Sequence, residues 1–224
     1  MKTDFLRRVP LFAGLSDEEF RELETIFQPR AYRKNQVIFV EEETGEYMYV
    51  VIAGKVKASK TSATGKETIL AIHQPGDFFG EMSLLDGKTS PATVSAMEDC
   101  KIAIISRADF QRLLMCNERV VSQIIQVLCS RLRSVWNQVQ SLSYSNADSR
   151  IRAGVLQLAR RHGINDARGI LINLKITHDE LAKMVGTSRE TVTRTLTDLQ
   201  KQGIIKMADR RIIVCDAKKL APIS

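Results

Sequence analysis

One segment near the end of the chain, residues 176–205, limits the fold most, because it predicts two short helices joined by a sharp turn. Thr177 followed by Glu180 forms a capping box that opens the first helix, and Gly186 supplies the left-handed residue that ends it. The second helix is expected to begin near Ser188, and three apolar residues gather on one of its sides: Val192, Leu196 and Leu199. The segment therefore predicts a helix-turn-helix whose second helix is anchored to a core.

The opposite side of the second helix is charged. At about 100° per residue, Arg189, Glu190 and Arg194 fall within about 140° of arc. Arginine can chelate a guanine edge and glutamate can accept a hydrogen bond from a cytosine amino group, so we predict that these three side chains read bases in the major groove. The alternative is that Glu190 completes a capping box with Thr187 and that the arginines form only a solvated face.

The run Ser188-Arg189-Glu190-Thr191-Val192-x-Arg194 resembles the recognition helix of the cyclic-AMP receptor protein/fumarate-nitrate regulator (CRP/FNR) family, particularly the cyclic-AMP receptor branch. The resemblance extends over roughly residues 5–215. It implies a cytoplasmic, homodimeric transcription regulator that binds double-stranded DNA at a TGTGA-like inverted repeat and contacts RNA polymerase. Six residues are the expected phosphate contacts: Thr177, Ser188, Thr191, Thr193, Arg210 and Arg211.

The charge distribution supports a polyanionic partner. Residues 147–224 hold 15 Lys and Arg against 8 Asp and Glu, an excess of +7, whereas residues 1–146 hold 18 of each. The whole net charge of the chain therefore lies in its last third, as expected for a DNA-binding module attached to a neutral module.

Residues 32–106 predict an antiparallel β-roll, because short apolar runs alternate with glycine turns. The runs are 37–40, 48–52, 68–72, 93–96 and 101–105. Before them, Ser16 and Glu19 form a second capping box that opens a helix. We expect an α+β fold with three parts: an effector-sensing β-roll domain (1–116), a dimerisation helix (117–145) and a winged helix-turn-helix domain (146–224).

The long helix carries an apolar seam whose residues are spaced alternately by four and three positions. It comprises Val121, Ile125, Leu128, Leu132, Val135, Val139 and Leu142. A seam of three heptads is what a two-stranded coiled coil requires, so we predict a homodimer. The alternative is a single helix packed on its own domain. After it we expect a helix over 148–162, a loop over 165–169, a strand over 170–174 and a hairpin wing of 204–207 with 211–214.

An effector pocket is expected in the roll, where residues 75–85 resemble the phosphate-binding cassette of cyclic-nucleotide-binding domains. Gly80-Glu81 match the pair that binds the ribose in those relatives, but Ser90-Pro91 stand where they have an Arg-Ser pair for the phosphate. On the long helix, Val135-Trp136 stand where relatives place Thr-Ser against adenine. The predicted pocket comprises Gly80, Glu81, Met82, Ser83, Ser90, Pro91, Val135 and Trp136.

These departures argue against cyclic AMP, because a buried phosphate without a cationic partner costs several kcal/mol. A cyclic-nucleotide effector held by Lys88 or by backbone donors remains the alternative, and Glu81 capping the turn that follows it is a second reading. No haem, iron–sulfur or metal-ligand signature is visible, so the effector stays unknown. His73 lies on the predicted roll and His178 belongs to the predicted DNA-binding helix, and a lone histidine is more often structural than a haem ligand.

Other classes of protein fit the sequence less well. No Ser/His/Asp arrangement or P-loop indicates an enzyme, and no run of 18 apolar residues indicates a membrane span. A nucleotide-binding module that regulates another protein is the competing function. The cysteines, at positions 100, 116, 129 and 215, are scattered and suggest reduced, buried thiols.

Overall fold

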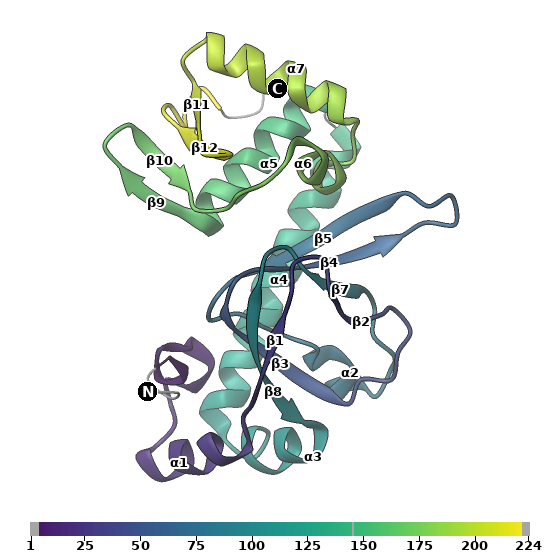
Figure 1. The fold of residues 1–224 in the computed structure, drawn as a ribbon, viewed down its shortest axis with the longest axis vertical. Helices are drawn as coiled ribbons and strands as arrows, with labels where there is room; N and C mark the ends of the chain where they lie inside the picture. Colours follow the sequence, from purple (N-terminus) through teal and green to yellow (C-terminus); the bar gives the residue numbers. More distant parts are fainter. Residues whose placement is uncertain (1–4, 145, 221–224) are drawn as a thin grey trace. The chain divides into compact units, whose positions relative to one another are not determined.

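The computed structural model describes residues 5–144 and 146–220, and these residues form two compact units that divide between Leu132 and Arg133. The fold is α+β, and every strand pairing within it is antiparallel. Figure 1 shows the strands of the first unit in blue to teal and those of the second in green to yellow. The predicted fold class, a β-roll, a long helix and a winged helix-turn-helix, is confirmed.

The first unit is built on two four-stranded sheets, ordered β1-β8-β3-β6 and β2-β7-β4-β5. Their strands are β1 (Gln28–Tyr32), β2 (Val37–Phe39), β3 (Tyr47–Ala53), β4 (Val56–Thr61), β5 (Glu67–His73), β6 (Phe78–Phe79), β7 (Thr93–Ala96) and β8 (Cys100–Ser106). The five predicted runs coincide with β2, β3, β5, β7 and β8. The strands β1, β4 and β6 were not predicted.

Each of those three strands has a weak sequence signal. Strand β1 contains Pro29 and four of its five residues are exposed, which suits the edge position it occupies beside β8. Strand β4 is mostly polar, and the ion pair between Lys57 Nζ and Glu67 Oε1 (2.5 Å) links it to β5. Strand β6 has only two residues, too few to show a period.

Short helices close the ends of the roll. Before the strands come η1 (Leu6–Arg8), η2 (Pro10–Phe12) and α1 (Asp17–Ile26), and α1 begins at the predicted capping box of Ser16 and Glu19. Within and after the strands come α2 (Glu81–Asp86), α3 (Arg107–Asp109) and the π-helical turn η3 (Phe110–Leu114). They bring apolar side chains from both ends of the first unit into one core.

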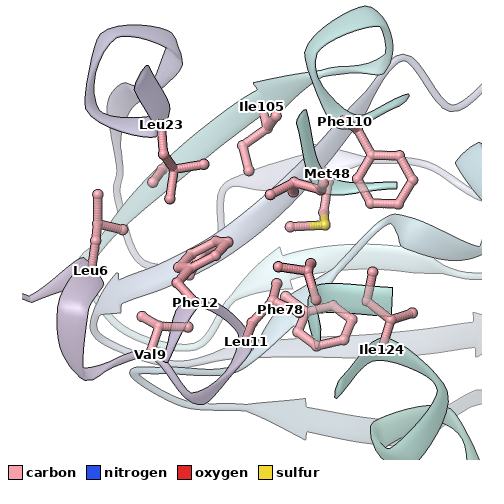
Figure 2. Packing of buried hydrophobic residues seen from close by; sticks show 14 of the residues in the cluster. Leu6, Val9, Leu11, Phe12, Leu23, Met48, Phe78, Ile105, Phe110 and Ile124 are labelled. Carbon is pink, nitrogen blue, oxygen red and sulfur yellow. The ribbon is translucent and has the colours of Figure 1, made fainter. Parts of the chain in front are cut away.

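The main core of the first unit joins these helices to the long helix α4 (Glu118–Tyr144). Figure 2 shows Phe12, Met48, Phe110 and Ile124 converging from four different elements. Each of these four side chains is at most 2% exposed, so the start of α4 is fixed on the roll by burial of apolar surface.

The second unit holds the rest of α4, the helices α5 (Ala147–His162), α6 (His178–Val185) and α7 (Arg189–Lys201), and a four-stranded sheet ordered β11-β12-β10-β9. Its strands are β9 (Gly163–Asp166), β10 (Gly169–Ile172), β11 (Ile205–Ala208) and β12 (Arg211–Val214). The predicted hairpin wing corresponds to β11 and β12, with a shift of one residue in the first strand.

The loop expected over residues 165–169 is correct only at Ala167 and Arg168, because its other residues lie in strands. Residues 163–166 form β9, which pairs with β10 through a tight turn at Ala167 and Arg168. The Arg168 guanidinium binds the Asp166 carboxylate through two hydrogen bonds of 2.8 and 3.1 Å, and this closes the hairpin. Most of β9 is exposed and carries little apolar alternation, so its sequence looked like a loop.

The expectation that all four cysteines are buried is wrong. Cys116 and Cys129 are exposed, because Cys129 lies on the outer side of α4 and Cys116 in the turn just before it. In the part of the chain that the structure describes, no helix combines the length and the apolar content that a membrane span needs.

Candidate DNA-binding face and effector site

The first helix of the helix-turn-helix, α6, begins and ends as the sequence predicts. The Glu180 N–H donates to Thr177 Oγ1 (3.1 Å), and the Thr177 N–H donates to Glu180 Oε2 (2.7 Å). Gly186 ends the helix in the left-handed conformation, with φ 68° and ψ 46°, and its N–H donates to Ala182 O. Two short helices joined by a glycine turn are thus fixed by local hydrogen bonds.

The second helix, α7, presents the three predicted base-reading side chains. Arg189, Glu190 and Arg194 are exposed. The apolar side of the helix is almost fully buried, at 2% exposure or less for each residue: Val192, Leu196 and Leu199. Burial of that side fixes which side of α7 faces solvent, so the charged residues are available to a partner.

The alternative capping role for Glu190 is wrong. The N-cap of α7 is Ser188, whose hydroxyl accepts from the Thr191 N–H at 3.2 Å. Hydrogen bonds from its own backbone N–H and from the Ser188 side chain lower the pKa of Glu190, and the neighbouring Arg189 adds to the effect. Glu190 therefore remains an ionised acceptor, the form that can bind a cytosine amino group.

The six predicted phosphate contacts lie in two places. Thr177 and Ser188 are helix N-caps, while Thr191 and Thr193 are on the first turns of α7. The Thr193 hydroxyl donates to Arg189 O (2.9 Å) and lies 2.8 Å from His178 Nδ1. His178 is therefore a candidate functional residue that the sequence did not indicate.

Arg210 and Arg211 lie at the tip of the β11–β12 hairpin. Asp209 (φ 49°) and Arg210 (φ 60°) are both left-handed, which is the geometry of a two-residue turn between twisted strands. Arg210 is exposed and Arg211 partly so. A cationic hairpin tip of this kind suits contact with a phosphate backbone, and that role stays a prediction for both residues.

The effector cassette in the first unit centres on Glu81. Gly80 is left-handed (φ 81°), and a Cβ there would lie 2.8 Å from Tyr47 O, so only glycine fits. Glu81 is the first residue of α2. It is 1% exposed, and its Oε1 accepts from Arg131 Nη1 of α4 at 2.7 Å. The reading of Glu81 as a cap stays a prediction, because a hydrogen bond from its own backbone N–H also acts to lower the pKa of Glu81.

Arg131 was not predicted as a site residue. Its Nη2 also donates to Phe78 O, and its guanidinium lies 4.9 Å from the centroid of the Phe78 ring. Burial raises the pKa of Glu81, and the charge of Arg131 partly offsets this. The other carboxylate oxygen, Oε2, is buried and has no hydrogen-bond partner among the residues that the structure describes. Fifty residues separate Arg131 from Glu81, so no local pattern connects them.

Ser90 stands where relatives bind the phosphate, but its backbone groups already have hydrogen-bond partners. Ser90 is buried, its N–H donates to Glu43 O (2.8 Å), and its carbonyl accepts from the Glu42 N–H (2.9 Å). Pro91 has no N–H, and Lys88, the alternative cation, is exposed. This part of the cassette offers no arginine fork to an anion.

The remaining predicted pocket residues differ in exposure and are divided between the two units. Met82 is 47% exposed, whereas Ser83 is buried and its carbonyl accepts from Arg107 Nη2 at 3.2 Å. Val135 and Trp136 belong to the second unit and are 52% and 63% exposed. Their place in an effector pocket stays a prediction.

Helix α4 carries apolar side chains that are about half exposed in the part of the chain that the structure describes. Val120 and Ile124 are buried in the roll, and Val121 and Leu128 are partly buried. The other seam residues with described side chains are about half exposed: Ile125, Leu132, Val135 and Val139. The Leu142 side chain lies outside the described residues. Within the first unit, packing on the roll therefore buries only one side of α4.

Comparison with known proteins finds a matching domain family for each of the two units. Residues 29–117 match the cyclic nucleotide-binding domain model, and residues 149–223 match the Crp-like helix-turn-helix domain model. A cyclic AMP receptor protein of Thermus thermophilus is 34% identical over 215 residues, which cover 96% of each chain. A CRP-like cAMP-activated global transcriptional regulator of Mycobacterium tuberculosis is 28% identical over 218 residues, 97% of each chain. The solved structure of FixK2 from Bradyrhizobium japonicum is similar with a TM-score of 0.77 and 26% identity, covering 87% of this chain and 96% of that one.

Proposed function

Because the chain belongs to the CRP/FNR family of DNA-binding transcription regulators, we propose that it binds a TGTGA-like inverted repeat as a homodimer, under control of an effector other than cyclic AMP. Its relatives are transcription regulators, and it is not an enzyme. The finer statements rest on residues of this chain. The observation that carries the proposal is the exposed set Arg189, Glu190 and Arg194 on a helix whose other side is buried.

The proposed DNA sequence follows from hydrogen-bond chemistry. Arg189 and Arg194 each donate two parallel hydrogen bonds to the O6 and N7 atoms of a guanine, and Glu190 accepts from a cytosine amino group on the opposing strand. Two G·C pairs read by arginine fit the two guanines of a TGTGA half-site. Phosphate contacts from the caps of α6 and α7 and from Arg210 at the wing fix the register.

The proposed homodimer follows from the open seam of α4. Four seam residues and Trp136 each leave about half or more of their surface exposed along one helix. Side chains at this spacing pack as knobs into holes against a parallel copy of the same helix. A two-fold dimer then presents two α7 helices to two half-sites, which explains the inverted repeat. RNA polymerase is a proposed further partner by family resemblance.

The proposed effector is not cyclic AMP, although two relatives are described as a cyclic AMP receptor and a cAMP-activated regulator. In this chain the backbone N–H and carbonyl of Ser90 are already hydrogen-bonded to Glu43 and Glu42. Pro91 has no N–H to donate, and the Lys88 side chain is exposed. A cyclic nucleotide would therefore bury its phosphate charge without a matched donor set. Phosphate binding by Lys88 is the competing proposal.

The experiment is a binding selection with full-length protein and a random duplex library, followed by sequencing of the retained DNA. We expect an inverted repeat whose half-sites contain TGTGA or a one-base variant. Wild-type protein is compared with Arg189→Ala and Arg194→Ala, each of which should relax one base pair and leave the other positions unchanged. Enrichment of an unrelated motif, or retention of DNA without sequence preference, would overturn the base-reading assignment.

A further inference from the structure

Three backbone carbonyls at the turn of the helix-turn-helix accept hydrogen bonds from side chains that belong to other helices. Gln138 Nε2 of α4 donates to Met184 O at 3.3 Å. Arg150 of α5 donates through Nε to Val185 O (3.1 Å) and through Nη2 to Gly186 O (3.3 Å). All of these residues belong to the second unit, so the contacts lie within one compact body.

The end of α6 explains why these carbonyls need partners. The last four carbonyls of an α-helix have no partner within the helix. In α6 the N–H groups of Gly186 and Thr187 both turn back to Ala182 O, so the glycine turn serves that carbonyl. The three carbonyls that follow at the turn are served by α4 and α5. The guanidinium of Arg150 also lies at the negative end of the α6 dipole, where a cation is stabilising.

Close packing accompanies these hydrogen bonds. A Cβ at Gly154 of α5 would lie 2.5 Å from Val185 Cγ1, which is too close for both atoms, so α5 meets α6 here at a glycine. Val185 is 8% exposed. On α4, Gln138 is half-buried although its neighbours Asn137 and Val139 are exposed, because its side chain reaches across to α6. The turn is therefore held from two helices that lie outside the helix-turn-helix.

The angle of α7 at this turn decides whether its arginines can meet the bases. Arg194 lies six residues beyond the N-cap Ser188. That is about 9 Å along the helix, so a rotation of about 10° at the turn moves Arg194 by about 1.5 Å. Base-reading hydrogen bonds need donor–acceptor distances of roughly 2.7–3.2 Å, whereas attraction to a phosphate falls off gradually with distance. Operator binding thus depends on a fixed turn more strongly than non-specific binding does.

Building on the proposed DNA binding, we propose that Gln138 and Arg150 are positioning residues for base reading, which fix the angle of α7 by holding the carbonyls of the turn. Gln138 lies on α4 between Val135 and Val139, two residues of the proposed dimer seam. The helix that pairs the two subunits therefore also holds the turn that orients α7. Packing of the seam and recognition of the operator are coupled through this one side chain.

The test compares changes on α4 in the full-length protein. Gln138→Glu keeps the shape of the side chain but replaces its donor by an acceptor, and Gln138→Ala removes the donor without adding charge. Gln138→Lys restores a donor. Gln140→Glu is the matched control, because it adds the same charge two residues away at an exposed position. Fluorescence anisotropy at constant salt measures the affinity for the selected operator and for a random-sequence duplex.

The ratio of operator affinity to random-duplex affinity should fall at least about fivefold in Gln138→Glu and in Gln138→Ala, the factor that one neutral hydrogen bond contributes. Gln138→Lys and Gln140→Glu should keep the wild-type ratio. Arg150→Lys keeps the charge but loses the two-pronged contact, so it should lower the ratio as well. Sedimentation velocity and thermal unfolding show whether each variant is dimeric and folded.

Hydrogen exchange gives a second readout, which needs no DNA. The N–H groups of Gly186 and Thr187 should exchange faster in Gln138→Glu than in Gln140→Glu, because the turn opens more often. An operator-to-random ratio that stays at the wild-type value in Gln138→Glu and Gln138→Ala overturns the positioning role, and faster exchange alone would make Gln138 only a cap of α6. A wild type that prefers no operator over random DNA overturns the proposed function instead.

Discussion

Arg131 and Glu81 form an ion pair within the first unit, with Arg131 Nη1 lying 2.7 Å from Glu81 Oε1. The Glu81 side chain is 2% exposed and the Arg131 side chain 26%. The pair connects the start of the effector cassette to the helix that carries the predicted dimer seam. A group that binds at Glu81 therefore acts directly on a residue of α4, which is the link that control by an effector requires.

We expect Arg131→Met to destabilise the protein by about 3 kcal/mol at neutral pH, the lower end for breaking a buried pair, because Arg131 is partly exposed. Burial raises the pKa of Glu81, so its contribution to stability is present at low pH and is lost as the pH rises through its folded pKa. Removing Arg131 takes away the charge that lowers the pKa of Glu81, so that pKa should rise further. The deficit against wild type should therefore grow from about pH 4 towards neutrality, as measured by urea unfolding at several pH values.

The matched control is the double variant Glu81→Gln with Arg131→Met. It leaves no charge at the site of this pair, so it should recover most of the stability that Arg131→Met loses, and its difference from wild type should vary less with pH. The single variant Glu81→Gln completes the comparison. If the double variant loses the sum of what Arg131→Met and Glu81→Gln lose separately, the two residues do not act as a pair.

Millimolar cyclic AMP should leave the melting temperature almost unchanged. A ligand present at a hundredfold excess over its Kd stabilises the folded state by about 2.7 kcal/mol. In a chain of this size, that stabilisation raises the melting temperature by at least a few degrees. Differential scanning fluorimetry with and without the nucleotide makes the measurement. A saturable shift that disappears in Lys88→Ala would support the competing proposal, in which that lysine binds the phosphate.

Replacing Arg189 or Arg194 by alanine should weaken binding to the selected operator by about 1–3 kcal/mol and relax the preference at one base pair. The matched control is Lys201→Ala, at the end of α7 away from the predicted bases, where the loss should be small and independent of sequence. Competition binding against single-base operator variants separates the two patterns. A uniform loss across all of the variants for Arg189→Ala would make that residue a phosphate contact.

The parts predicted correctly depend on neighbours in the sequence. The capping boxes at Ser16 and Thr177, the left-handed Gly186 and the two sides of α7 each need only a few consecutive residues, and all four are present. The missed features depend on distant partners or on very short runs. Arg131 meets Glu81 across 50 residues, and His178 meets Thr193 only after the turn has folded.

A charge in the seam of α4 should prevent self-association. Val139 is 56% exposed in the single chain, so Val139→Glu costs the monomer little. In a parallel coiled coil it would bury two like charges against each other, and the dimer should dissociate. Gln140→Glu is the matched control, because it adds the same charge one residue away and off the seam.

Sedimentation velocity at micromolar concentration should show a dimer for wild type and Gln140→Glu and a monomer for Val139→Glu. The monomeric variant should also lose tight binding to the inverted repeat but keep weak binding to a single half-site, since each subunit retains its own α7. A monomeric wild type would contradict the dimer proposal. A Val139→Glu variant that stays dimeric would place the contact between subunits elsewhere than on the α4 seam.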